Sequence, residues 1–231
     1  MLQEEVRAMQ MRHEHKFYLN YLDYMVIRSK LSAVMQADTH VSEDGRYLIR
    51  SLYFDNAADK ALREKADGVS QREKFRIRCY NGNHDFIRLE KKLKSGGLGT
   101  KISARLTKEE TQRIIDGDIA FMKDSGRPLL TELYGKMTTE RLRPKTIVDY
   151  TREPFIYDAG NVRVTLDYDI RTGLSCTDML HDVPTIQTEP GLVILEVKYD
   201  NFLPDVIRDI IQLRNREVSA FSKYMSCRKY F

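Results

Sequence analysis

The chain has 231 residues, of which 42% are hydrophobic, and a formal net charge of +4. This length is enough for a substantial core, and no apolar run reaches the roughly 20 residues of a membrane-spanning helix, so we expect no direct insertion into a membrane. The three cysteines lack metal-type spacing, which argues against a disulfide framework. Residues 1–10 are polar and acidic rather than basic and then apolar, so we expect no signal peptide and a cytoplasmic protein.

The first half of the chain alternates between predicted strands and helices. Strands are predicted at 11–19, 46–54, 73–80, 84–93 and 101–106, and helices at 24–35 and 56–66. Asp23 is the predicted N-cap of the first helix. The turn Asn81-Gly82-Asn83 predicts a β-hairpin between the third and fourth strands.

The second half begins with two helices and ends with two more. Thr107 with Glu110 forms a capping box that opens a helix to about residue 115, and Pro128 begins a helix that ends at 139. Strands are predicted at 145–152, 162–171 and 192–199, and terminal helices at 204–214 and 222–228. Hairpin spacings favour antiparallel pairing, and no repeat or linker divides the chain. We therefore predict a single α+β domain over residues 1–231.

Charged residues recur at every second position of the predicted strands, with apolar residues between them. The charged sets are Arg12, Glu14 and Lys16; Arg76 and Arg78; Arg88, Glu90 and Lys92; Arg163 and Asp167; and Glu196 and Lys198. Alternate residues of a strand share one face, so each strand has an apolar face and a mainly cationic one. A single charged face is common on the solvent-exposed side of a sheet. Several charged faces in one chain indicate a sheet that curls around an interior able to bind a polyanion.

The predicted hairpin brings the largest group of cations together. Its two strands place Arg76 and Arg78 beside Arg88, Glu90 and Lys92, within reach of one ligand. The arginine fork binds phosphate oxygens in pairs, while lysine supplies a point charge. The alternative is a solvent-exposed sheet face with cross-strand ion pairs.

The acidic members of these faces are Glu14, Glu90 and Glu196. Such carboxylates are either ion-pair partners or ligands of a hard cation such as magnesium or manganese. For a single Glu the ion pair is the commoner role. For Glu196 the metal role competes, because it lies in the apolar run 192–197 and a buried carboxylate needs a positive partner.

Other motifs are less informative. The glycine-rich segment 95–101 lacks the GxxxxGKS/T spacing, so we predict a turn with Lys101 as its only site residue. His13 and His15 alternate with Glu14 and are predicted to lie on the opposite face. No arrangement of Ser, Cys and His supports a covalent nucleophile. Nucleic-acid binding is not expected, because the cations fall on inferred interior faces without interleaved aromatic residues. The sequence identifies no protein partner.

Seven short segments, in register along the chain, resemble one known family. They are RHEHKF at 12–17, SLYFDN at 51–56, KFRIRCY at 74–80, LEKK at 89–92, RVTLD at 163–167, ILEVKY at 194–199 and FSKY at 221–224. Together they resemble the catalytic domain of the vacuolar transporter chaperone (VTC) polyphosphate polymerases, which are triphosphate tunnel metalloenzymes related to CYTH proteins. The resemblance spans nearly the whole chain. One departure is Arg12, which stands where the wider superfamily has the first Glu of an ExExK motif.

The resemblance implies an antiparallel β-barrel that forms a tunnel, with helices packed outside. It implies binding of ATP or another triphosphate and of polyphosphate, a divalent manganese or magnesium ion, and transfer of the γ-phosphate of ATP to polyphosphate. Carried over to this sequence, the catalytic residues are Lys16, Arg76, Arg78, Lys92, Arg163 and Glu196. The resemblance also assigns phosphate binding to Lys101, Arg152, Ser222 and Lys223, and the metal to Glu196. From the charged strand faces themselves we add Arg12, Arg88 and Lys198 as phosphate-binding residues and Glu14 and Glu90 as metal ligands.

Two other functions remain open at this point. The same scaffold would serve an inorganic triphosphatase or nucleotide hydrolase, in which water replaces the acceptor phosphate. A non-catalytic polyphosphate-binding module would also need the cationic lining. Polymerase and hydrolase differ in the nucleophile that enters the site, not in the residues that hold the phosphates.

Overall fold

The computed structural model describes residues 12–38, 41–42, 44–96, 98–212 and 220–229. The prediction for residues 1–10 and the end of the helix predicted to reach residue 214 lie outside these ranges. Among the helices that are described, none combines the length and apolar character needed to cross a membrane.

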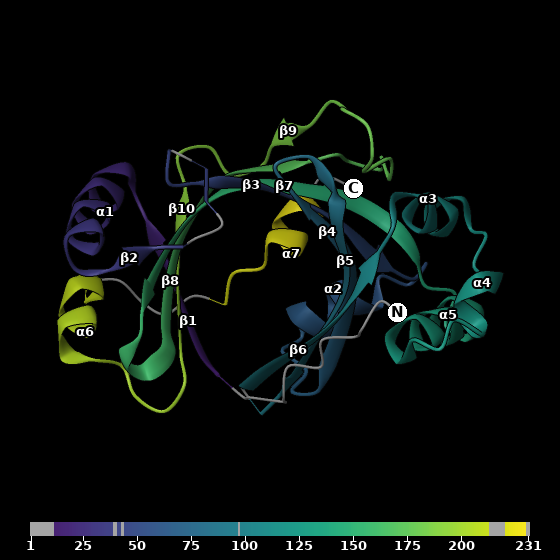
Figure 1. Cartoon of the computed structure of the whole chain (residues 1–231), viewed down its shortest axis with the longest axis horizontal. Helices are drawn as coiled ribbons and strands as arrows, with labels where there is room; N and C mark the ends of the chain where they lie inside the picture. Colours follow the sequence, from purple (N-terminus) through teal and green to yellow (C-terminus); the bar gives the residue numbers. More distant parts are fainter. Residues whose placement is uncertain (1–11, 39–40, 43, 97, 213–219, 230–231) are drawn as a thin grey trace.

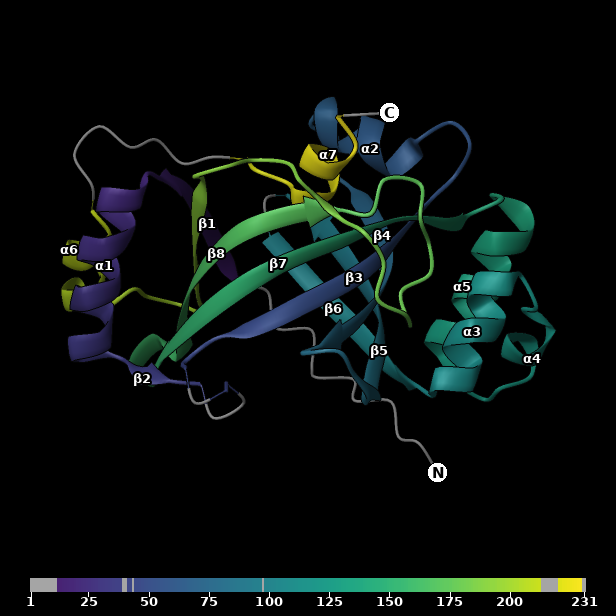
Figure 2. The same cartoon turned by 90° about the horizontal axis from the view of Figure 1, so that it is seen from above.

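The strands form one antiparallel sheet that curls strongly (Figures 1 and 2). Its order is β1-β10-β8-β7-β3-β4-β5-β6, with β2 added to β7 and β9 to β8. The strands are β1 (His13–Leu19), β2 (Gln36–Ala37), β3 (Tyr47–Asp55), β4 (Arg72–Tyr80), β5 (Asn83–Ser95), β6 (Leu98–Leu106), β7 (Arg143–Tyr157), β8 (Val162–Thr172), β9 (Ile186–Gln187) and β10 (Val193–Tyr199). A bridge between Arg12 and Gly99 brings the two ends of the sheet together. The predicted α+β fold with a curled antiparallel sheet is confirmed.

Helices cover both outer flanks of the sheet (Figure 1). They are α1 (Tyr21–Val34), α2 (Lys60–Ala66), α3 (Lys108–Asp116), α4 (Ala120–Lys123), α5 (Pro128–Thr139), α6 (Asp205–Ile211) and α7 (Lys223–Cys227), with a 3-10 turn at Ala159–Asn161. Figure 1 shows α1 and α6 beside one flank and α3, α4 and α5 beside the other. The short helix α7 instead lies on the inner side, against β7, β8 and α2.

The core has three parts because the sheet has two faces. One part lies between α3–α5 and β4–β6, and includes Ile77 and Leu130. A second lies under α1 and α6 and includes Val164. The third lies inside the curve, where Tyr224 of α7 packs with Tyr150. The alternating strand pattern thus sends one apolar face outward to the helices, while the concave face carries the charged residues together with the apolar patch under α7.

Local side-chain contacts explain where helices begin. The N-cap of α1 is Asn20 rather than the predicted Asp23, because Asn20 Oδ1 accepts a hydrogen bond from the Asp23 N–H at 2.8 Å. The helix predicted at 56–66 begins only at Lys60, because the Asn56 side chain accepts from the Ala58 and Lys60 N–H groups and shapes a turn. The capping box at Thr107 and the bounds of α5 are as predicted.

The assignment of this cap is open to measurement. Replacing Asn20 with Ala is expected to lower the free energy of unfolding by about 1 kcal/mol, because the acceptor for the first helical turn is lost. Replacing Asp23 with Ala is expected to cost less, because its N–H, not its side chain, takes part in the cap. Urea denaturation of the two variants compares them, and a larger loss for the Asp23 variant would contradict the assignment.

Candidate functional site

Cross-strand register places the predicted charged residues on the concave face of the sheet. Glu14 faces Lys198 and Lys16 faces Glu196 between β1 and β10. In the same way Arg76 faces Glu90 and Arg78 faces Arg88 between β4 and β5. Residues that face each other on antiparallel strands share one side of the sheet. Glu90 is 1% exposed and Arg78 5%, so these two do not lie on a solvent-exposed outer face.

One wall of the interior carries Arg76, Arg78, Glu90 and Lys101, which we call the arginine cluster. Arg76 Nε donates to Glu90 Oε2 at 2.7 Å and Lys101 Nζ lies 2.9 Å from Glu90 Oε1, while Arg78 is 3.8 Å away. Burial alone would raise the pKa of Glu90, but the guanidinium groups of Arg76 and Arg78 hold it well below its usual range. Glu90 is therefore ionised and orients both arginines.

The opposite wall carries Glu14 and Glu196, which we call the glutamate pair. Lys16 Nζ lies 3.0 Å from Glu14 Oε1 and 3.9 Å from Glu196 Oε1. Lys92 Nζ is 2.7 Å from Glu14, and Lys198 Nζ is 2.9 Å from Glu196. Burial and the neighbouring Glu196 act to raise the pKa of Glu14, but Lys16 and Lys92 outweigh them and lower it to about 2. Burial would also raise the pKa of Glu196, but Lys198 and Lys16 hold it well below its usual range, so both carboxylates are ionised at neutral pH.

A third group links the glutamate pair to the terminal helix. Arg152 forms a bidentate ion pair with Asp167, both contacts at 2.6 Å, and Arg152 Nη2 donates to Glu196 Oε2 at 3.3 Å. Lys223 Nζ lies 2.6 Å from the same Asp167. Ser222 caps α7, its hydroxyl accepting from the Met225 N–H at 3.4 Å. The structure thus brings Lys223 and Arg152 into the interior, whereas the Ser222 hydroxyl serves the helix end.

The side chains of the remaining predicted residues contact other partners. Arg163 donates to Asp38 at 2.7 Å and to the Tyr47 hydroxyl at 2.9 Å. Arg88 lies over the Phe86 ring, 4.6 Å from its centroid. Arg12 pairs with Asp200 at 2.8 Å, near the 3-10 turn, and is not brought to the glutamate pair. His15 hydrogen-bonds with the Tyr199 hydroxyl at 3.0 Å.

Sequence reasoning missed two tyrosines that line the interior. The Tyr53 hydroxyl accepts from Arg76 at 2.8 Å, and the Tyr150 hydroxyl accepts from Arg78 at 3.1 Å. Asp167 was predicted to lie on a charged face, but its role of holding Arg152 was not predicted. The strand parity of the two tyrosines places them on the inner face, but only charged residues were used to interpret the strand pattern. Burial would raise the pKa of Tyr53, yet Arg76 and Lys74 outweigh it and lower the pKa to about 7.

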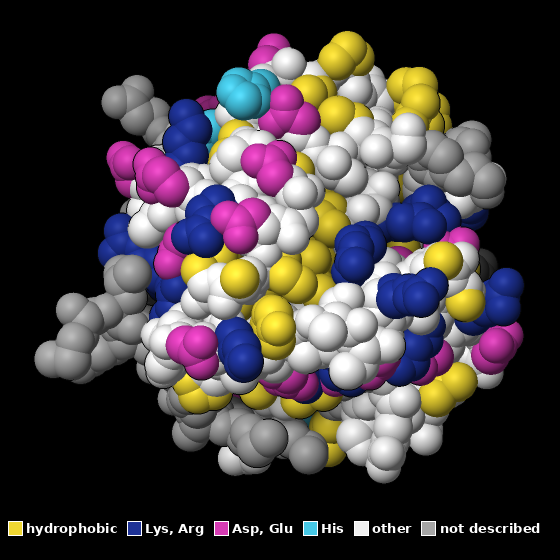
Figure 3. Space-filling model, turned by 90° about the vertical axis from the view of Figure 1, so that its right-hand side faces the viewer, with side chains coloured by type: hydrophobic (Ala, Val, Ile, Leu, Met, Phe, Trp, Pro, Cys, Tyr) yellow, Lys and Arg dark blue, Asp and Glu magenta, His cyan; other side chains and the backbone are white. Residues whose placement is uncertain are grey.

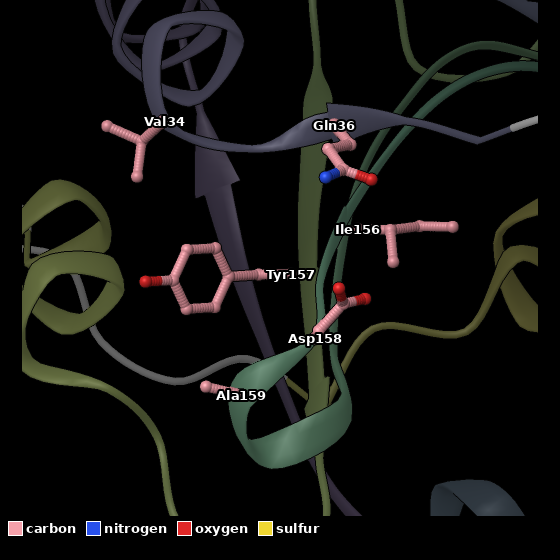
Figure 4. A pocket seen from close by; sticks show the side chains of 6 residues that line it. All are labelled: Val34, Gln36, Ile156, Tyr157, Asp158 and Ala159. Atoms are coloured by element: carbon pink, nitrogen blue, oxygen red, sulfur yellow. The ribbon is translucent and has the colours of Figure 1, made fainter.

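Two hollows lie away from these groups. One of about 260 Å³ lies between the end of α1 and the β7–β8 turn, and Figure 4 shows its six lining residues, which include Asp158 but no Lys or Arg. Another hollow, of about 420 Å³, is lined by Asp55 and Lys145, where β3 ends and β7 begins. The outer surface over α3–α5 mixes cations, carboxylates and apolar side chains (Figure 3). The ordered array of cations belongs to the concave face.

The acidic residues fit a divalent cation only in part. In the described part of the chain, no three His, Cys, Asp or Glu residues gather as a complete ligand set. Glu90 belongs to the arginine cluster, so it is separate from the glutamate pair. Magnesium is commonly held by one or two carboxylates together with substrate phosphates, which the glutamate pair fits. Thr165 lies beside Glu196 in the sheet, and its buried hydroxyl has no hydrogen-bond partner among the described residues. This hydroxyl is therefore a further oxygen ligand available to a cation held by Glu196.

Comparison with known proteins agrees with this geometry. The model of the VTC domain family matches residues 11–231, so the chain belongs to the VTC domain family. The fold is similar to that of a putative adenylyl cyclase from Hippeastrum, described as having a dominant triphosphatase activity, with a TM-score of 0.58, 14% identity and 96% of each chain covered.

Weaker similarity extends to two further structures. A putative adenylate cyclase from Bacillus halodurans has a TM-score of 0.46 and 14% identity, with 86% of each chain covered. A Mimivirus capping-enzyme triphosphatase has a TM-score of 0.41 and 14% identity, covering 88% of this chain and 86% of that one. Among proteins with curated descriptions, none matched this sequence.

The low pKa of Tyr53 predicts a tyrosine transition at neutral pH. Below about pH 7 its phenol is neutral, and above that pH it is a phenolate held by Arg76 and Lys74. Ultraviolet absorbance should therefore show one tyrosine ionising far below the ordinary value of about 10. The transition should vanish in Tyr53→Phe and persist in Tyr21→Phe, which alters a tyrosine that is 65% exposed. A wild-type protein without this early transition would contradict the electrostatics described for the interior.

Proposed function

We propose that this protein binds ATP and polyphosphate inside the curled sheet and transfers the γ-phosphate of ATP to the polyphosphate chain. The observation that carries the proposal is the excess of cations over carboxylates on the concave face. The cations there include Lys16, Lys74, Arg76, Arg78, Arg88, Lys92, Lys101, Arg152, Arg163, Lys198 and Lys223, and the carboxylates include Asp38, Asp55, Glu14, Glu90, Asp167 and Glu196. A linear polyanion is the ligand class that such an interior fits.

The ion pairs already present prepare the cations for phosphate. Glu90 holds Arg76 and Lys101 in place at 2.7 and 2.9 Å, which limits the rotamer freedom that binding would otherwise remove. Arginine forks then meet phosphate oxygens in pairs, and lysines add point charge. Transfer of a phosphoryl group requires in-line positioning and neutralisation of charge more than covalent chemistry, and these side chains supply both.

A divalent cation has a place in this arrangement. We propose that Glu14 and Glu196 hold manganese or magnesium together with oxygens of the bound phosphates. When bound, such a cation neutralises charge on the phosphate oxygens at the reacting centre. Lys16 lies between the two carboxylates and would turn its ammonium group to the phosphates. Arg152 and Lys223, fixed by Asp167, bound the same space from the side of α7.

A second function fits the same residues. A hydrolase would use the same cations and carboxylates, with water in place of the acceptor phosphate. The fold is similar to that of the Hippeastrum protein, which is described as having a dominant triphosphatase activity. This similarity supports the hydrolase as an alternative function. A binding module without turnover is the third possibility and needs only the cationic face.

One assay separates the three functions. Purified protein is incubated with ATP and manganese, and polyphosphate, orthophosphate and ADP are measured. Long-chain polyphosphate with an equivalent amount of ADP supports the polymerase. Orthophosphate with ADP and no polymer would replace it with the hydrolase, and nucleotide binding without either product would leave the binding module.

The role of Glu196 is tested by a pair of matched substitutions. Glu196→Gln is expected to lower the metal-dependent rate by at least about 100-fold while much of the nucleotide affinity remains, because a ligand charge is lost at the reacting centre. Glu90→Gln alters an equally buried carboxylate outside the glutamate pair and should leave the concentration of manganese needed for half-maximal rate unchanged. If Glu196→Gln kept full metal-dependent turnover, Glu196 would be only an ion-pair partner.

A further inference from the structure

A second set of cations continues the concave face where β4 begins, β5 ends and α2 ends. It consists of Lys65, Arg72, Lys74 and Lys94, which we call the rim cluster. Arg72 faces Lys94 and Lys74 faces Lys92 across the β4–β5 pair. Because Arg72 and Lys74 precede Arg76 at alternate positions, they lie on the same side of the sheet as the arginine cluster.

Among the described residues, the rim cluster has no acidic partner, unlike the lysines of the glutamate pair. Within the described residues, no carboxylate lies at ion-pair distance from any of its four members. Arg72 donates to the Val69 carbonyl, and Lys74 Nζ lies 5.3 Å from the centre of the Tyr53 ring. By contrast, Lys16, Lys92 and Lys198 each lie within 3.0 Å of a carboxylate oxygen.

Uncompensated positive charge is also evident in the lysine pKa values. Burial and the neighbouring cations Lys92 and Arg76 lower the pKa of Lys74 to about 8. Burial, together with Arg72, lowers the pKa of Lys65 and of Lys94 as well. An anion placed among these groups would remove the mutual repulsion, so the free protein holds the cluster in a state that favours binding a polyanion.

The position of the cluster indicates how such a ligand would extend. From Arg78 to Arg72 there are six residue steps along β4, or about 20 Å of strand. Lys74 is only two steps from Arg76, but Arg72 is four steps, or about 13 Å, from it, and Lys94 and Lys65 lie beside Arg72. Three linked phosphate groups held by Arg76 and Arg78 therefore leave Arg72, Lys94 and Lys65 free. A longer chain of the same chemistry reaches both places at once.

We propose that the rim cluster binds phosphate groups of a linear polyphosphate beyond those held by the arginine cluster and the glutamate pair. The inference rests on the proposed function and narrows it, because it makes long-chain polyphosphate, rather than a triphosphate alone, the preferred ligand. A triphosphatase would have no use for these additional cations. The rim cluster is thus a feature that favours polymer handling over triphosphate hydrolysis.

The test compares two ligands on the whole protein by calorimetry. Wild-type protein and Lys65→Ala/Lys94→Ala are titrated with tripolyphosphate and with long-chain polyphosphate. The variant is expected to lose about tenfold in long-chain affinity, or about 1.4 kcal/mol, and to bind tripolyphosphate within about twofold of wild type. The control Lys108→Ala/Lys123→Ala removes the same charge from exposed positions on α3 and α4 and should lose neither affinity.

The outcomes are distinguishable. If wild type binds both ligands and the Lys65/Lys94 variant keeps its long-chain affinity, the proposed role of the rim cluster is wrong, while the proposed function of the protein stands. If the control loses as much long-chain affinity as the variant, the effect is one of net charge and the inference also fails. If wild type binds neither ligand, the proposed function fails and the inference fails with it. Thermal melts establish that each variant is folded before titration.

Discussion

The mutual neutralisation of buried charges inside the curled sheet is the constraint on which the rest of the structure depends. Glu196 is 5% exposed and Asp167 is fully buried, and removing such carboxylates from water is costly unless cations surround them. Arg152 contacts both, Lys223 joins Asp167, and Lys198 joins Glu196. Taking one partner away would leave an unpaired charge in the interior. The cations that we propose bind phosphate are therefore also the cations that allow the sheet to close around its own carboxylates.

The layers of the fold follow from this constraint. The helices on the two flanks cover the apolar outer face of the strands that carry the charged sets, so the alternate, charged residues of these strands point inward. The short helix α7 completes the arrangement by carrying Lys223 to Asp167 and by stacking Tyr224 on Tyr53, with ring centroids 5.1 Å apart. Tyr53 in turn accepts a hydrogen bond from Arg76. The terminal helix is thus connected to both walls of the interior.

Alternation along single strands made much of this arrangement predictable. The parity of Arg76 and Arg78 with Glu90 was enough to predict a shared face, because the hairpin between them is short and local. Caps at Thr107 and the start of α5 at Pro128 were predictable for the same reason. The antiparallel class followed from hairpin spacing and from the resemblance to the VTC family.

What could not be predicted depends on pairing between strands far apart in the chain. The register of β1 with β10 brings Glu14 and Glu196 together, and the curvature of the sheet places Glu90 on another wall. Neither feature can be derived from a single strand. Arg12 shares the parity of Glu14, but Asp200 near the 3-10 turn draws its guanidinium away. Tyr53 and Tyr150 were missed because a tyrosine in a strand pattern counts as apolar until its hydroxyl is seen to have a partner.

The central claim is that the concave face holds a chain of phosphates between the arginine cluster and the glutamate pair. A crystal structure of the protein with tripolyphosphate and manganese tests it most directly. The account predicts phosphate oxygens on the guanidinium groups of Arg76 and Arg78 and on Lys16, with the metal ion on Glu196. Phosphate bound only on the outer surface, with the interior ion pairs unchanged, would contradict it.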